Sequence, residues 1–128
     1  MRFYVFIQLY YKIFLWSLVI AYLCFSPSDG FKKVPIIIPH MDKVVHFIMF
    51  FILGMLMETI KTRVLNLVTR FGLPLLGMVY GGLIELVQHY LINGRHGDLI
   101  DWTADIMGLI IGIGFVKILP LKLQRVLS

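Results

Sequence analysis

Ionisable and amide side chains gather in one part of this chain, on both sides of a short glycine-containing turn. Residues 80–105 read YGGLIELVQHYLINGRHGDLIDWTAD, and an earlier group lies at 42–46, DKVVH. Carboxylates beside an arginine or lysine can bind a ligand head group. Carboxylates beside a histidine can bind a divalent cation, and a histidine or glutamate can act as a general base. We call the following residues the polar cluster: Asp42, Lys43, His46, Glu85, Gln88, Arg95, Asp98, Asp101 and Asp105.

The composition indicates that this cluster lies in a membrane protein. The 128 residues are 59% hydrophobic and only 15% charged, whereas soluble domains carry about 25% charged residues. The formal charge of +5 does not point to nucleic acid, because the basic residues stand between apolar runs rather than in a basic stripe. The expected partner is the lipid bilayer, with no nucleic acid. We expect one domain over residues 1–128.

The apolar runs predict an all-α polytopic fold. About twenty apolar residues cross a bilayer as a helix. A retained signal-anchor helix is preferred over a cleaved signal peptide for the first run, since no Ala-x-Ala-like site follows it. A proline-rich connector at 26–41 and a basic linker at 61–72 interrupt the runs. The predicted transmembrane helices are at about 4–25, 43–60, 72–91 and 100–119.

The basic residues predict the orientation. Four spans place both termini and the middle linker on one side, which carries Arg2, Lys61, Arg63, Arg70, Lys122 and Arg125. On the opposite side, lysines and an arginine are offset by aspartates. The positive-inside rule then predicts cytoplasmic termini, in the inner membrane of a bacterium, and an outward-facing polar cluster.

Helical spacing brings the cluster into one layer. Asp42 and His46 are four residues apart and share a helix face. In the third span, glycines precede Glu85 at four-residue intervals, and in the fourth span they follow Asp105. Small residues at this spacing let helices approach closely in lipid. We therefore expect a tight antiparallel hairpin of the third and fourth spans, packed through Gly77, Gly81, Gly108 and Gly112.

Several chemistries fit this layer. Arg95 is the natural bidentate partner of a buried carboxylate, and Lys43 is the second choice. A polar pocket for a ligand head group is favoured over a structural network of ion pairs, because the cluster exceeds what packing needs. A divalent cation is an alternative, but no compact metal motif is present, so no metal ligands or cofactor are assigned. General base catalysis on a lipid-linked phosphate is also open, although no nucleophile elbow, P-loop or HExxH motif supports a reaction.

These motifs resemble the VanZ-like family of bacterial membrane proteins over residues 40–116. The family pattern reads Asp-Lys-x-x-His-Phe, then Tyr-Gly-x-x-x-Glu-x-x-Gln, then Gly-Arg-x-x-Asp-x-x-Asp. The matching residues are Asp42, Lys43, His46, Phe47, Tyr80, Gly81, Glu85, Gln88, Gly94, Arg95, Asp98, Asp101 and Asp105. The namesake of the family is linked to resistance to the glycopeptide teicoplanin. The resemblance implies a small polytopic membrane protein. The convergent charged layer motivates the hypothesis that its outward pocket binds a cell-envelope precursor, lipid head group or glycopeptide, and a contribution to teicoplanin-type resistance is a further hypothesis.

Overall fold

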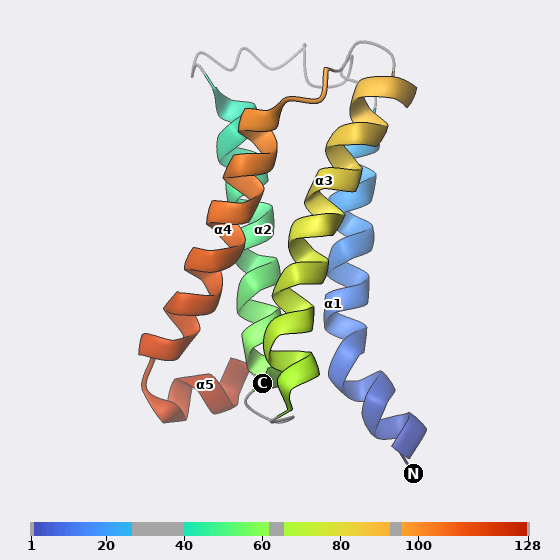
Figure 1. The fold of residues 1–128 in the computed structure, drawn as a ribbon. Coiled ribbons are helices and arrows are strands. Elements are labelled where there is room, and N and C mark those ends of the chain that lie inside the picture. Colours follow the sequence, from blue (N-terminus) through green and yellow to red (C-terminus); the bar gives the residue numbers. More distant parts are fainter. Residues whose placement is uncertain (1, 27–39, 62–65, 93–95, 128) are drawn as a thin grey trace.

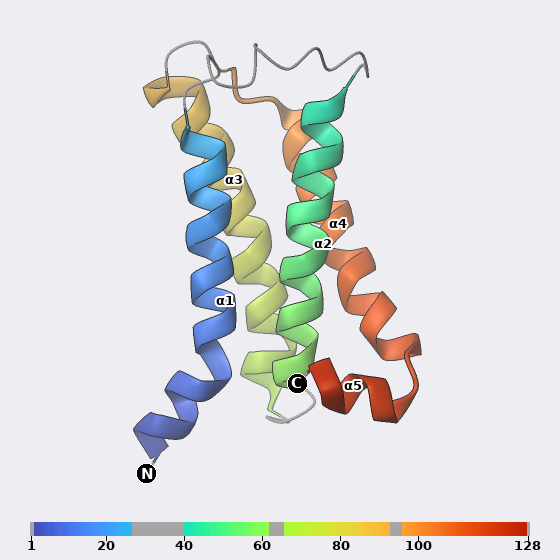
Figure 2. The same cartoon turned by 180° about the vertical axis from the view of Figure 1, so that it is seen from behind.

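The computed structural model describes residues 2–26, 40–61, 66–92 and 96–127, and within these ranges all regular structure is helical. Four long helices lie side by side, and a short fifth helix lies across one end of the bundle (Figures 1 and 2). The α-helices are α1 Arg2–Phe25, α2 Met41–Lys61, α3 Leu73–Leu91, α4 Leu99–Ile118 and α5 Leu121–Leu127. The prediction of an all-α fold is confirmed. Helix α1 begins and α5 ends at the same end of the bundle (Figure 1).

Three helical segments are long and apolar enough to cross a membrane. They are Met41–Ile60, Val68–Leu91 and Leu99–Ile118. Helix α1 is 24 residues long, but its apolar part in the described residues is the shorter stretch Tyr10–Phe25. Three of the four predicted spans therefore have the length and composition of transmembrane helices, and the first is a shorter apolar helix.

The third span begins earlier than the sequence predicts. A π-helical turn, Val68–Gly72, runs directly into α3, so the expected linker at 61–72 is partly helical. The Asn66 side chain accepts a hydrogen bond from the Thr69 amide at 2.7 Å and so caps this turn. Pro74 has no amide hydrogen to donate to the preceding turn, and a wide turn is a common way for a helix to absorb such a gap.

The closest contact between helices joins α2 and α4. A Cβ atom added to Gly108 would collide with the Phe47 carbonyl oxygen. The same addition at Gly112 would collide with the carbonyl oxygen of Phe51, and at Gly54 with that of Leu109. The backbones of α2 and α4 therefore touch, which only glycine allows at these positions.

The expected hairpin of the third and fourth spans is thus corrected. Gly108 and Gly112 pack on α2 instead of α3, and Gly54 of α2 completes the same contact. The glycines of α3 contact side chains: Gly77 lies against Leu109, and Gly81 lies against Asp105. Helix α3 consequently approaches α4 less closely than α2 does, which leaves room for side chains between α3 and α4.

Aromatic side chains also donate hydrogen bonds to backbone carbonyls of neighbouring helices. The indole of Trp16 donates to the Met49 carbonyl at 2.9 Å and ties α1 to α2. The indole of Trp102 donates to Met78 at 2.9 Å and ties α4 to α3. The Tyr80 hydroxyl donates to a carbonyl of α1, that of Ser17. Buried aromatic N–H and O–H groups need such partners, so these bonds fix how the helices are turned.

The core lies where α1, α2, α3 and α4 meet. Its largest fully buried side chains include Ile20, Phe50, Leu53, Ile84 and Leu109. Glu58, near the end of α2, is also buried, with 7% of its surface exposed. The outer faces of the long helices expose leucine, isoleucine and valine, which suits contact with lipid.

The α2–α4 contact can be tested with two matched glycine substitutions in α4. Gly108→Ala places a methyl group against the Phe47 carbonyl, whereas Gly114→Ala places one in open space. We expect Gly108→Ala to lower the free energy of unfolding by about 1–3 kcal/mol, the usual cost of overpacking, and Gly114→Ala to change it little. Thermal unfolding in detergent can be followed with a thiol-reactive dye, because the single cysteine, Cys24, is buried. Equal unfolding temperatures for the two variants would contradict the close contact.

Candidate functional site

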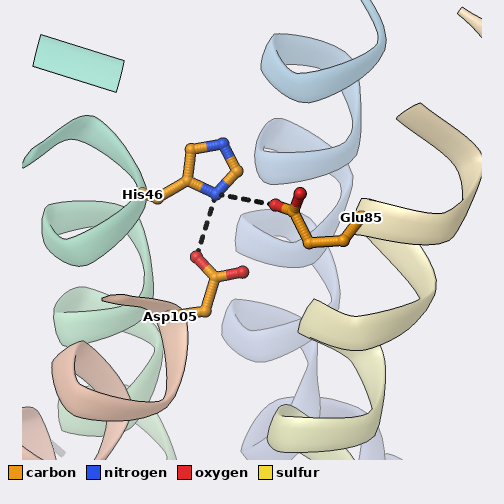
Figure 3. Close-up of side chains that lie close together, drawn as sticks. All are labelled: His46, Glu85 and Asp105. Carbon is orange, nitrogen blue, oxygen red and sulfur yellow. Dashed lines mark hydrogen bonds and ion pairs between the residues drawn. The ribbon is translucent and has the colours of Figure 1, made fainter. Parts of the chain in front are cut away.

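Three buried ionisable side chains from three helices meet near one end of the bundle. His46 of α2 lies 3.0 Å from Asp105 of α4, measured from Nδ1 to a carboxylate oxygen, and 3.4 Å from Glu85 of α3 (Figure 3). The exposed fractions are 0% for His46, 1% for Asp105 and 7% for Glu85. We call these three residues the buried triad. The imidazole Nδ1 faces both carboxylates, and the other ring nitrogen points away from them (Figure 3).

Each member of the buried triad keeps one polar atom without a hydrogen-bond partner among the described residues. These atoms are His46 Nε2, Glu85 Oε1 and Asp105 Oδ2. A buried polar atom without a partner costs about 1–3 kcal/mol, so native structures rarely keep several in one place without a purpose. The buried triad is therefore a candidate to hold a cation or to exchange a proton.

A second group of charges lies above the buried triad, toward the ends of the helices. The Lys43 ammonium donates to Asp101 at 2.8 Å and to Asp98 at 3.4 Å. Asp98 caps α4, since its side chain accepts from the Ile100 amide at 3.0 Å. This hydrogen bond and the nearby Lys43 ammonium lower the pKa of Asp98 from its usual value, so the carboxylate is held in its charged form.

Asp98 also joins the two groups. Its backbone amide donates to Glu85 Oε2 at 3.0 Å, while Glu85 Oε1 faces His46. The glutamate carboxylate is thus held between the cap of α4 and the imidazole of α2. Because this bond crosses from α3 to the start of α4, the position of Glu85 depends on where α4 begins.

Two members of the polar cluster, Asp42 and Gln88, lie apart from these contacts. Helix α2 begins at Met41, so Asp42 lies in its first turn, where it is exposed. The Gln88 side chain donates to the Cys24 carbonyl of α1 at 2.9 Å and so ties α3 to α1. Arg95, the expected bidentate partner, lies outside the described residues. Lys43, the second choice, forms ion pairs with Asp98 and Asp101.

A groove of about 420 Å³ lies beside the site, between α3 and α4. Much of its wall is apolar, with Leu83, Leu86 and Trp102 among the lining residues. Glu85 and Asp98 also line it, so the groove meets the polar cluster directly. Sequence reasoning missed this groove. The only signal was that Leu83 and Leu86 are three residues apart, and this spacing is common on any lipid-facing helix.

The described residues of the polar cluster carry more acidic than basic groups. The described part of the polar cluster contains five carboxylates, on Asp42, Glu85, Asp98, Asp101 and Asp105, but only Lys43 and His46 as basic groups. An excess of carboxylates attracts cations and repels anions. A positively charged head group or a metal ion therefore fits these residues better than a bare phosphate, which would need a bridging cation.

Comparison with known proteins gives one match. The family model described as VanZ/LLP1 matches residues 3–120, which include every residue of the polar cluster. No curated protein and no solved structure matches the chain.

The Lys43–Asp101 ion pair can be tested by charge reversal. Asp101 is 3% exposed, so Lys43→Ala would leave its carboxylate buried without a cation. We expect this variant to lose on the order of 1–3 kcal/mol of unfolding free energy. The double variant Lys43→Asp, Asp101→Lys should recover part of the loss if the pair has a structural role alone. Chemical or thermal unfolding in detergent measures both changes, and an unchanged stability of Lys43→Ala would contradict the pairing.

Proposed function

The chain belongs to the VanZ/LLP1 family, and we propose that it is an inner-membrane protein of bacteria that binds an amphiphilic cell-envelope component at its outward-facing end. Family membership and three helices of membrane-spanning length make it a multi-pass membrane protein of the VanZ type. In this proposal α1 is the fourth span, because a 24-residue helix is about 36 Å long and a hydrocarbon core is about 30 Å thick. Residues 1–128 then form a single domain.

The basic residues support an orientation with both termini in the cytoplasm. Arg70, Lys117, Lys122 and Arg125 belong to the end of the bundle where α1 begins and α5 ends. Positively charged residues near the ends of spans remain on the cytoplasmic side. The polar cluster and the groove belong to the opposite end, which then faces the outer side of the membrane.

One observation carries the proposed binding function: Glu85 and Asp98 belong both to the polar cluster and to the wall of the apolar groove. An amphiphile presents the same combination, an apolar chain joined to a polar head. The chain would lie along Leu83, Leu86 and Trp102, and the head group would meet the carboxylates. Candidate ligands are a lipid-linked envelope precursor, a lipid head group or a glycopeptide.

The family resemblance supports a contribution to teicoplanin-type resistance through this site. A protein that binds an envelope precursor, or the glycopeptide itself, changes how much free precursor the antibiotic meets. Deleting the protein should therefore lower the concentration of teicoplanin that stops growth, and reintroducing it should restore that concentration. Unchanged susceptibility to teicoplanin would contradict the resistance role. It would not contradict binding of an envelope component, which the lipid-binding experiment below tests.

Two other functions fit the site less well. An acid–base enzyme acting on a lipid-linked phosphate would need Glu85 as its base, because His46 is fully buried and does not line the groove, and the phosphate would meet an excess of carboxylates there. In a purely structural network the buried polar atoms would be satisfied, yet the buried triad keeps three that have no hydrogen-bond partner in the described residues.

The orientation can be checked with single cysteines in a Cys24→Ser background. His96 precedes α4 and Lys122 lies in α5, and both are exposed. We expect a membrane-impermeant maleimide to label His96→Cys in intact cells. The same reagent should label Lys122→Cys only after permeabilisation. The reverse pattern would contradict cytoplasmic termini.

Ligand binding can be checked by blocking the groove. Leu86→Trp adds bulk inside the groove, whereas Leu75→Trp adds it on a lipid-facing part of α3 that does not line the groove. Native mass spectrometry of the purified protein with envelope lipids, such as an undecaprenyl-linked precursor supplied with a divalent cation to bridge its phosphates to the carboxylates, should show one bound lipid on wild type. The affinity for the lipid should fall roughly tenfold for Leu86→Trp, since the overpacking cost of about 1–3 kcal/mol includes the roughly 1.4 kcal/mol that a tenfold change in affinity requires.

The control variant defines the outcome that would contradict this proposal. Leu75→Trp should bind the lipid as wild type does. An equal loss of lipid binding in both variants would mean that the lipid binds anywhere around the outer surface of the helices. The absence of bound lipid on wild type would exclude the groove as a lipid site.

A further inference from the structure

We propose that the buried triad of His46, Glu85 and Asp105 binds one divalent transition-metal cation. The evidence for this metal site does not rest on the envelope ligand proposed above. It comes from the atoms of Glu85, His46 and Asp105 that are buried between the helices. The three residues come from α2, α3 and α4, so a bound ion would join three helices at one point (Figure 3).

The distances fit a shared ion. Each residue offers one ligand atom, and these atoms all lie within 4.8 Å of one another. His46 Nδ1 is 3.0 Å from Asp105 and 3.4 Å from Glu85. Metal–ligand bonds of about 2.1 Å place neighbouring ligand atoms about 3.0 Å apart at a right angle and about 3.4 Å apart at the tetrahedral angle. Two of the three distances therefore match those around one ion, and the carboxylate oxygens of Glu85 and Asp105 would close on it from a separation of at most 4.8 Å.

The balance of charge also favours an ion. Two carboxylates buried near a neutral imidazole carry two negative charges in a region of low dielectric constant, where isolated charges are costly. A divalent cation neutralises both at once. A protonated imidazole supplies only one positive charge. It would also leave Glu85 Oε1, which lies 3.4 Å from His46 Nδ1, without a hydrogen bond, whereas an ion would bind this oxygen.

The ligand types indicate the class of metal. One imidazole with two carboxylates is a donor set that suits Zn²⁺ or Mn²⁺. Calcium takes six to eight oxygen ligands, and magnesium keeps several waters, so neither matches a compact site with a nitrogen ligand. Zn²⁺ and Mn²⁺ are accordingly the ions to test, with Mg²⁺ as the comparison.

Residues around the triad position its carboxylates and give an ion access to it. The Asp98 amide donates to Glu85 Oε2 at 3.0 Å and so holds the carboxylate in position, as residues behind metal ligands commonly do. Gly81 leaves space for Asp105, since an added Cβ would lie 3.1 Å from Oδ2. Glu85 also lines the groove, which gives an ion a path to the otherwise buried triad.

Metal binding can be measured directly on the full chain in detergent. The protein is stripped with a chelator, loaded separately with Zn²⁺, Mn²⁺ or Mg²⁺, and passed over a gel-filtration column before elemental analysis. We expect one Zn²⁺ or Mn²⁺ per chain, little Mg²⁺, and a higher unfolding temperature by circular dichroism with the bound ion. Cobalt substituted at the site should give an absorption spectrum that indicates nitrogen and oxygen ligands.

Matched variants locate the ion. Asp105→Asn and Glu85→Gln should each weaken binding roughly tenfold or more, since each removes an anionic ligand. Asp101→Asn is the control, because it removes a buried carboxylate of the same layer that contacts Lys43 instead of the triad. It should retain one ion per chain.

Two results would overturn the site. The first is wild-type protein that elutes without bound Zn²⁺ or Mn²⁺, a measurement that needs no variant and so holds even where a variant fails to fold. The second is equal loss of binding in Asp101→Asn and Asp105→Asn, which would mean that the layer attracts cations by its overall charge and not through the triad.

Discussion

The direct backbone contact between α2 and α4 is the constraint on which the rest of this structure depends. Phe47 follows His46 in the chain, and its carbonyl touches Gly108, three residues after Asp105. The contact therefore lies next to the His46–Asp105 pair. A side chain at Gly108 would separate the helices and lengthen the 3.0 Å distance between the imidazole and the carboxylate. The glycines thus set the geometry of the polar site as well as the packing of the bundle.

Much of the fold follows from the sequence because membrane helices are defined by length and hydrophobicity. The bounds of the spans α2, α3 and α4 were predicted to within a few residues. The sequence also predicted that His46, Glu85 and Asp105 lie in one layer, where the structure brings them together. Helical spacing was sufficient for this, since residues at the same depth on neighbouring helices must lie near each other. The early start of the third span was missed, because the cap by Asn66 is a single polar residue in a basic linker.

The sequence could not tell which helix a glycine face contacts. Only a few residues separate the third and fourth spans in the chain, so adjacency in the sequence favoured that pair for Gly108 and Gly112. The structure pairs α4 with α2, and the deciding residue is Gly54, a lone glycine whose spacing carried no signal. Gln88 was assigned to the polar cluster because it follows Glu85 by three residues, close to the same side of the helix. It lies one helical turn on, at the boundary with α1, where its amide meets the Cys24 carbonyl.

The position of Glu85 explains why a buried triad and an open groove occur together. The Lys43–Asp101 pair lies between the triad and the helix ends, and the core of Phe50 and Leu109 lies below it. The triad is thereby shielded on both of these sides. Glu85 alone of the three lines the groove, with one carboxylate oxygen on the Asp98 amide and the other facing His46. Any ion or proton that enters through the groove must therefore pass Glu85, and a ligand head group in the groove meets the same carboxylate. Occupancy of the triad and binding in the groove then become coupled through one side chain, because each changes the charge that the other encounters.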